Sequence, residues 1–259
     1  MGKLRPVASD TLNPSDHYRK DSFRRGLERC GFEVGQPPKL DPDPSDVLVI
    51  WNRASSNVAL AERYEEAGAR VIVAENGYIG ADRNGWQLYA IALGHHLGAG
   101  EWPTRQDDRW AALGIELRPW RRAGREIVIL PQRGFGEPGI AMPKTWAEEV
   151  AERLKKVTDR PVRIRFHPGK ARTDPLPDLQ DAWAAVTWAS GAGIKALVAG
   201  IPVFHEMPSW VGGTAAKFGI EDIEDPFLGD RLPMLRRLAW SQWTEAEIQE
   251  GTPFKCLLG

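Results

Sequence analysis

Small residues between two strand-like runs form the part of the sequence best suited to chemistry. The segment 187–204 reads as a strand, a turn containing Ser190, Gly191 and Gly193, a short helix and another strand. Small residues let backbone N–H groups approach a ligand, and the N-terminal end of a helix carries partial positive charge. We therefore predict that the amides around Ser190 to Gly193 converge on a phosphate or pyrophosphate. A tight turn without a ligand would use the same residues.

The same segment resembles a known family. The pattern Ser-x-x-x-x-Lys-Ala-Leu-x-x-Gly-x-Pro-Val over residues 190–203 is similar to the donor-site segment of GT-B glycosyltransferases, including capsular-polysaccharide and phage-encoded types. In that family the turn and helix start hold the diphosphate of a nucleotide sugar, and a Glu one turn into the helix often binds the ribose. Lys195 stands at that position here, and a lysine would reach a phosphate rather than the ribose.

Two further segments fit this resemblance. The polar loop 132–134 follows a strand-like run at 126–130, and the run 163–170 looks like the Arg-x-His-Pro strand end of capsule-type transferases, with His167 and Lys170 expected to point into a cleft. The resemblance implies a nucleotide-sugar co-substrate, expected to be a UDP-sugar such as UDP-glucose, and no other cofactor. The predicted donor-binding residues are Gln132, Arg133, Gly134, His167, Lys170, Ser190, Gly191, Gly193, Lys195 and Glu206.

Strand-like and helix-like runs alternate along the chain, which is typical of α/β proteins with mainly parallel sheets. Strands are predicted at 6–8, 46–51, 70–74, 88–93, 126–130, 161–166, 184–188 and 201–204, and helices at 17–30, 56–67, 144–157, 193–199 and 233–250. The weakly periodic segment 100–124 separates two such series. With the resemblance, this predicts two Rossmann-like domains, 1–122 for the acceptor and 123–232 for the donor, facing a central cleft, with a C-terminal helix and tail at 233–259 packing back.

Polar residues at predicted strand ends in the first half are candidates for the chemistry of the acceptor. Open α/β sheets bind ligands at the carboxyl ends of their strands. A general base must reach the acceptor hydroxyl, and the candidates are Glu75, Asp10 and His17. The predicted acceptor-binding residues are Asn52, Arg53, Asn76 and Tyr78.

Two other functions compete with a glycosyltransferase. Residues 134–139 match Gly-x-Gly-x-x-Gly directly after a strand, which is the dinucleotide fingerprint of an NAD-linked oxidoreductase. Pro138 interrupts that turn, however, and the next helix is predicted only near Lys144. The third function is a nucleotide-binding module that keeps the fold without chemistry, and Lys195 in place of Glu is the residue in its favour.

Composition limits the partners. Thirty-four Lys and Arg against 35 Asp and Glu give a formal net charge of −1, which is no global signature of a polyanion partner. Basic clusters at 19–29 and 118–125 leave open an acceptor in DNA, such as a hydroxymethylated base, beside a surface glycan. Two cysteines, no zinc spacing and no long apolar run predict a metal-independent, cytoplasmic protein without a membrane span. The oligomeric state stays open.

Overall fold

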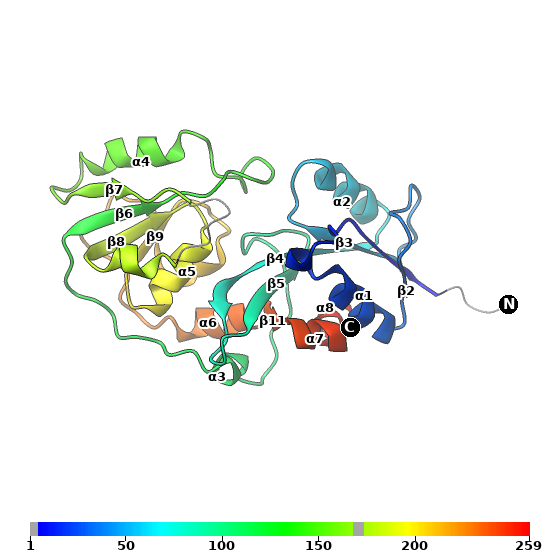
Figure 1. Cartoon of the computed structure of the whole chain (residues 1–259). Coiled ribbons are helices and arrows are strands. Elements are labelled where there is room, and N and C mark those ends of the chain that lie inside the picture. Colours follow the sequence, from blue (N-terminus) through cyan, green and yellow to red (C-terminus); the bar gives the residue numbers. More distant parts are fainter. Residues whose placement is uncertain (1–4, 168–173) are drawn as a thin grey trace. The chain divides into compact units, whose positions relative to one another are not determined.

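The computed structural model describes residues 5–167 and 174–259, which fold into two compact units. Unit 1 comprises the chain up to His96 together with 100–109 and 239–259, and unit 2 comprises 97–99 and 110–238. Each unit has its own sheet, hydrophobic core and flanking helices (Figure 1). Within the described ranges, no helix has the length and apolar character needed to cross a membrane.

Unit 1 contains a six-stranded sheet in the order β11-β5-β4-β3-β1-β2. Strands β1 to β4 are parallel to one another, whereas β5 is antiparallel to both of its neighbours, β4 and β11. The strands are β1 (Val7–Asp10), β2 (Glu33–Val34), β3 (Val47–Trp51), β4 (Arg70–Ala81), β5 (Gln87–Leu93) and β11 (Gln242–Thr244). The strand order reverses between β1 and β3, so the loops after these two strands meet at the switch point where open sheets bind ligands.

Helices cover both faces of this sheet (Figure 1). Helix α2 (Ser56–Glu66) packs Tyr64 against Leu48, Ile50 and Val73 on one face. The other face carries α1 (Lys20–Arg29), α7 (Glu245–Glu250) and α8 (Thr252–Leu258), with the short 3-10 helix η1 (Asp16–Tyr18) preceding α1. A methyl group on Gly26 of α1 would lie only 2.0 Å from the Ile248 carbonyl oxygen, which explains a glycine inside this helix.

Unit 2 contains five parallel strands in the order β10-β9-β8-β6-β7. They are β6 (Glu126–Leu130), β7 (Val162–Ile164), β8 (Ala182–Thr187), β9 (Val203–His205) and β10 (Lys217–Phe218). Helix α4 (Trp146–Leu154) packs on the face that carries Ile127, Ile129 and Val186, and α5 (Gly191–Val198) lies on the opposite face. The remaining helical segments are α3 (Arg109–Leu113), η2 (Leu176–Leu179), η3 (Val211–Ala215) and α6 (Leu232–Ala239).

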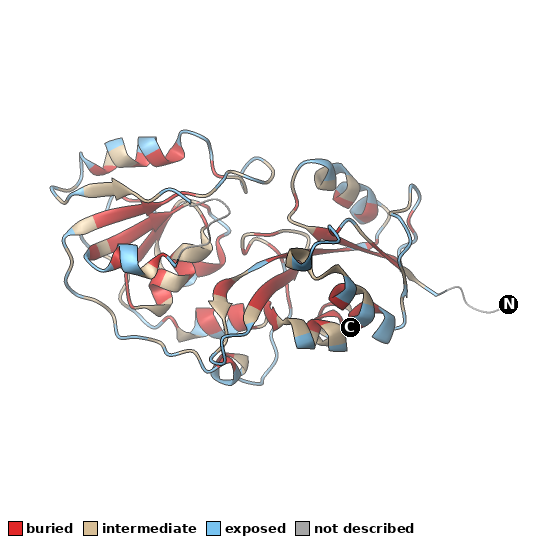
Figure 2. Ribbon diagram, viewed as in Figure 1, coloured by how far each residue is buried: buried red, intermediate tan, exposed pale blue. Residues whose placement is uncertain are grey.

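The architecture confirms the predicted α/β class with two parallel-dominated sheets. Figure 2 shows buried residues concentrated along the central strands of each sheet, where the sequence has its continuous apolar runs. In unit 2 the strand order reverses between β6 and β8, which is the flavodoxin-like 2-1-3-4-5 order. A cleft shared by the two domains stays a prediction.

The C-terminal region differs from the predicted single helix over 233–250. The structure has α6, then β11, α7 and α8. Thr244 forms a capping box with Glu247, so a new helix begins there, and Gly251 at φ 79 ends it. Residues 239–259 belong to unit 1, and the boundary between the units falls after Arg109, not after residue 122. The segment 233–259 is therefore not a separate C-terminal element.

Arg109 attaches this returning segment to unit 1. Its guanidinium donates to both carboxylate oxygens of Glu247, at 2.7 and 2.8 Å, and to the Gln242 carbonyl at 2.6 Å. It also lies 3.8 Å from the centroid of the Trp243 ring, which is fully buried. Burial alone would raise the pKa of Glu247. The hydrogen bonds from Arg109, its positive charge and the hydrogen bonds from Thr244 outweigh this effect, so the pKa lies below its ordinary value.

We predict that Glu247→Gln destabilises the protein by roughly 2 kcal/mol at neutral pH, because charged hydrogen bonds are lost. A lowered folded-state pKa contributes stability that is present above the unfolded pKa and lost as pH falls through the folded one. The difference between wild type and variant should therefore shrink below about pH 4.3. Urea unfolding at a series of pH values measures it, with the exposed Glu250→Gln as control. A difference that is constant with pH would contradict this role.

Candidate functional site

The candidate site in unit 2 lies where the loops after β6 and β8 meet. Thr187, the last residue of β8, is fully buried, and its hydroxyl donates to the Leu130 carbonyl of β6 at 3.1 Å. The Gln132 side-chain oxygen accepts from Ala189 N at 3.1 Å. Both loops leave the carboxyl edge of the sheet at its switch point, which is the position at which parallel α/β sheets bind ligands. The structure therefore brings the predicted residues of 132–134 and 190–193 to one edge.

Ser190 is the N-cap of α5 and organises the turn. Its hydroxyl oxygen accepts from Ala192 N at 3.1 Å, its carbonyl accepts from Gly193 N at 2.9 Å, and its own amide donates to the Thr187 hydroxyl at 2.9 Å. Three of the four amides expected to converge on an anion thus already have acceptors. The Gly191 N–H, which has no acceptor within the helix, and the proton of the Ser190 hydroxyl are the donors left for a ligand.

The glycines of this edge have separate reasons to be glycine. A Cβ on Gly193 would lie 3.1 Å from the Trp210 ring and 3.0 Å from the Thr187 methyl group, so this residue permits close packing rather than ligand approach. Gly134 has φ 68, in the left-handed region, and a Cβ there would lie 2.9 Å from the Met142 carbonyl oxygen. Gly191 is half-buried at the first position of α5, where it leaves the turn open.

Basic side chains gather at the same edge. Arg133 is exposed and lies over the Phe135 ring at 4.8 Å, and the Lys195 ammonium pairs with Asp174 at 3.6 Å. Desolvation of the ring, followed by the positive charges of Arg133 and Arg165, lowers the pKa of His167, so the imidazole is mostly neutral at pH 7. Asp174 partly compensates the charge of Lys195, whereas Arg133 forms no ion pair with the described residues and suits a phosphate. Lys170 lies outside the described residues.

Glu206 has a structural role at this edge. It follows β9, and one carboxylate oxygen accepts from the Trp146 indole N–H at 2.7 Å while the other pairs with Arg153 at 2.7 Å. The Glu206 carboxylate therefore fixes α4 to the sheet, and both of its oxygens have partners within the chain.

The loop 134–139 does not form the geometry of a dinucleotide fingerprint. Gly134, Gly136 and Gly139 all have positive φ, but the chain stays non-helical until α4 begins at Trp146. In the fingerprint a helix opens directly at the turn and presents its N-terminus to the pyrophosphate. This loop lacks that helix, which removes the main structural argument for an NAD enzyme.

In unit 1, Asp10 is a structural anchor. Its carboxylate pairs with Lys20 at 3.2 Å and Arg24 at 2.9 Å, accepts from Leu12 N at 3.1 Å, and is 4% exposed. These contacts join the end of β1 to α1. His17 lies in η1, where its ring contacts Tyr18 and Trp51 at centroid distances of 4.7 and 5.2 Å.

Glu75, Asn76 and Tyr78 lie inside a strand, not in the loop expected after residue 74. Strand β4 continues to Ala81 because β5 pairs with it, Glu75 opposite Ala90 and Asn76 opposite Tyr89. Strand β3 ends at Trp51, opposite Ala74, so these residues extend beyond the parallel part of the sheet. Glu75 is 9% exposed and accepts a hydrogen bond from the Tyr78 hydroxyl. The polar residues of this part of β4 are the reason why the sequence predicted a loop here.

Asn52 and Arg53 follow β3 at the switch point of unit 1. Arg53 is buried, donates to Glu65 at 2.6 Å, and its amide donates to His96 Nδ1 at 3.2 Å, so it fixes the loop rather than facing solvent. Asn52 has φ 57, and its buried side-chain oxygen has no hydrogen-bond partner within the described ranges. Ser55, with φ 54 and ψ −131, occupies a conformation that normally requires glycine. This loop is strained.

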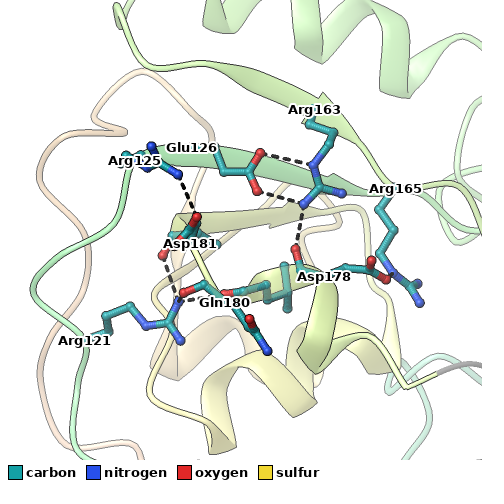
Figure 3. Close-up of polar contacts among 10 residues, drawn as sticks. Arg121, Arg125, Glu126, Arg163, Arg165, Asp178, Gln180 and Asp181 are labelled. Carbon is teal, nitrogen blue, oxygen red and sulfur yellow. Dashed lines mark hydrogen bonds and ion pairs between the residues drawn. The ribbon is translucent and has the colours of Figure 1, made fainter.

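Several side chains of the basic clusters are engaged within the chain. In the cluster at 118–125, Arg121 donates to the carbonyls of Leu179, Gln180 and Ala182, and Arg125 pairs with Asp181 (Figure 3). Figure 3 also shows Arg163 bound to Glu126. This network ties together the amino ends of β6 and β8, away from the candidate site. Such contacts give the arginines a structural role and weaken the case for a DNA-binding surface.

The residues that the structure describes include no group of three or more His, Cys, Asp or Glu placed to hold a metal ion. The adjacent His95 and His96 follow β5, and His96 is buried against the Arg53 amide.

Comparison with known proteins finds similarity at the level of the fold. No family model matches the chain, and no curated protein sequence matches it. Among solved structures, the Thermosulfurimonas dismutans KpsC β-Kdo 2,7 transferase is similar over 96% of this chain and 99% of its own, with a TM-score of 0.56 and 16% identity. The KpsC β-Kdo 2,4 transferase of that organism is similar over 91% of both chains, with a TM-score of 0.57 and 17% identity. The chain shares the fold of these transferases. This supports the predicted glycosyltransferase-like fold.

We predict that Arg133→Gln raises the pKa of His167, because removing a neighbouring positive charge favours the imidazolium form. The expected change is several tenths of a unit, as for one partly screened charge. An NMR pH titration of the imidazole measures it. Arg125→Gln, at the opposite end of β6, is the control and should leave the titration unchanged. Equal effects of both variants would show that Arg133 does not face His167.

We further predict that Ser55→Gly stabilises the protein by about 1 kcal/mol, because glycine adopts the observed backbone conformation without strain. The matched control is Ser15→Gly, at an exposed serine with ordinary φ −68. That variant relieves no strain and should be neutral or slightly destabilising. Urea unfolding compares the two, and destabilisation by Ser55→Gly would mean that the serine side chain supports the loop.

Proposed function

We propose that the protein is a glycosyltransferase that moves a sugar from a nucleotide-activated donor to a hydroxyl group of a glycan. The observation that carries the proposal is the Ser190 turn at the β6/β8 switch point, in a chain that shares the fold of two Kdo transferases. Unit 2 would hold the donor phosphate through the Gly191 N–H, the Ser190 hydroxyl and the basic side chains beside them.

The reaction breaks the bond between the anomeric carbon and a phosphate oxygen, and forms a bond to the acceptor oxygen. Negative charge develops on the leaving phosphate. The N-terminal end of α5, with Arg133 and Lys195, is suited to stabilise that charge. A neutral His167 would take up a proton as the phosphate arrives, since an adjacent anion raises the pKa of an imidazole.

The acceptor hydroxyl must lose its proton to a base. Of the three candidates, Glu75 is our choice. Two cations and a backbone amide already occupy the Asp10 carboxylate, whereas Glu75 stands just beyond the end of β3 with the Tyr78 hydroxyl to orient it. We propose that the reaction needs no metal ion, so that chelation leaves the rate unchanged.

A panel of nucleotide sugars would identify the donor. The sequence resemblance favours a UDP-sugar, and the names of the structural relatives add nucleotide-activated Kdo. We would incubate the protein with each donor and either a glycan, hydroxymethylated DNA or plain DNA, and measure mass gain. Gain on the glycan supports the proposal. Gain only on hydroxymethylated DNA would reassign the acceptor, and binding of NAD(H) with no response to any nucleotide sugar would refute the transferase.

We predict that Ser190→Trp abolishes donor binding in a calorimetric titration while the protein stays folded, because the indole fills the turn at the start of α5. Loss of the cap should cost about 1 kcal/mol, a shift in Tm of about 2–4 °C. The control is Ser45→Trp, at an exposed serine before β3 in unit 1. Retained donor affinity in Ser190→Trp would show that the turn is only structural.

A further inference from the structure

An aromatic cluster lies at the carboxyl end of β3 in unit 1. Trp51, the last residue of that strand, contacts Tyr18 at 4.9 Å, His17 at 5.2 Å and Tyr89 at 6.3 Å between ring centroids. Tyr89 of β5 is buried, whereas His17, Tyr18 and Trp51 are each partly exposed. His17 and Tyr18 come from η1, which follows β1, and Trp51 ends β3. The cluster therefore lies at the switch point between β1 and β3.

Polar contacts of Tyr89 and Arg19 fix the position of the rings. The Tyr89 hydroxyl accepts from Arg19 Nε at 2.8 Å, and the same guanidinium pairs with Glu245 at 3.3 Å. The contacts of Trp51 with Tyr18 and Tyr89 are edge-to-face, with interplanar angles of 86° and 76°. Such packing fixes the indole without stacking a ring in parallel on its face.

Two polar groups of the cluster are available to a ligand. The Trp51 indole N–H and the Tyr18 hydroxyl make no hydrogen bond within residues 5–167 and 174–259. An aromatic ring with a free donor at its edge suits a sugar ring, whose C–H groups pack on the aromatic face while its hydroxyls take up the donors.

Backbone strain concentrates around the same cluster. Arg19, Asn52 and Ser55 have φ of 50, 57 and 54, and they lie in the two loops that carry Tyr18 and Trp51. Asn52, directly after Trp51, also holds the buried oxygen without a partner noted above. Strained residues persist where the surrounding structure holds them, and they cluster at active sites and ligand-binding loops.

The charges nearby favour a neutral, hydroxyl-rich ligand over a nucleic acid. Arg19 pairs with Glu245, and Lys20 and Arg24 both pair with Asp10. A phosphate backbone would need unpaired cations beside the rings. These three are already compensated by carboxylates.

We propose that this cluster is a sugar-binding subsite in which Trp51 is the stacking platform and Tyr18 supplies a hydroxyl contact. The inference rests on the proposed function, since it would place a sugar of the acceptor glycan on unit 1. It names residues that the prediction from sequence did not include.

The test uses the full chain labelled with fluorotryptophan, with the Trp51 resonance assigned from Trp51→Phe. The probes are the methyl β-glycosides of galactose and glucose, and a short single-stranded oligodeoxynucleotide. We expect a glycoside to shift the Trp51 resonance and to leave that of Trp86 unchanged, because Trp86 is 67% exposed at the tip of the β4–β5 hairpin and outside the cluster.

Matched variants give the affinity. Trp51→Leu should weaken glycoside binding roughly tenfold, as the loss of one ring contact predicts, and Tyr18→Phe less. Trp86→Leu is the control and should bind as wild type. Because the shift is read in the wild-type protein, the proposal stays testable even if Trp51→Leu fails to fold.

The outcomes separate the two proposals. A Trp51 shift with a glycoside supports the subsite even if no donor is ever turned over. If no glycoside shifts Trp51 while a nucleotide sugar shifts the His167 imidazole, the subsite is refuted and the transferase stands. A Trp51 shift with the oligodeoxynucleotide alone, or equal shifts at Trp51 and Trp86, would also overturn the sugar-binding assignment.

Discussion

The hydroxyl of Thr187 is the contact on which the candidate donor site depends. It is fully buried, donates to the Leu130 carbonyl of β6 and accepts from the Ser190 amide, so one side chain joins two adjacent strands to the turn that follows them. The start of α5 is thereby fixed relative to the end of β6. Gln132, in the loop after β6, accepts from the Ala189 amide and so makes a second connection between the two loops. Buried hydrogen bonds of this kind are costly to break, because the separated donor and acceptor would stay buried without water or another partner.

The two units solve the same geometric problem with different side chains. Each has a strand-order reversal at which two loops meet. In unit 2 the loops are joined by neutral hydrogen bonds, and Arg133 at this edge forms no ion pair with the described residues. In unit 1 the Asp10 carboxylate takes up Lys20 and Arg24, and aromatic rings cover the edge instead. One sheet edge is therefore suited to a phosphate and the other to an uncharged ring.

Sequence patterns predicted the central strands because buried parallel strands are continuous apolar runs, such as 126–130 and 184–187. They failed where pairing, not composition, decides the structure. β4 extends through Glu75 and Asn76 only because β5 lies beside it, and the polar residues there look like a loop. The short strand β11 was hidden in what reads as a helix, since Trp243 is buried by a partner far away in sequence.

The candidate site shows the same limit. The sequence indicated the turn at Ser190, because small residues before a helix are a local signal. It could not show that three of the amides there would be satisfied within the chain, or that Gly193 is small because of Trp210. Thr187 is the one polar residue of the predicted strand 184–188, and Trp51 is the aromatic residue at the end of the predicted strand 46–51. Both positions end a strand at a switch point. A residue that breaks the character of a central strand at its carboxyl end is thus a better indicator of a site than a charged residue in the following loop, which the chain tends to neutralise for its own stability.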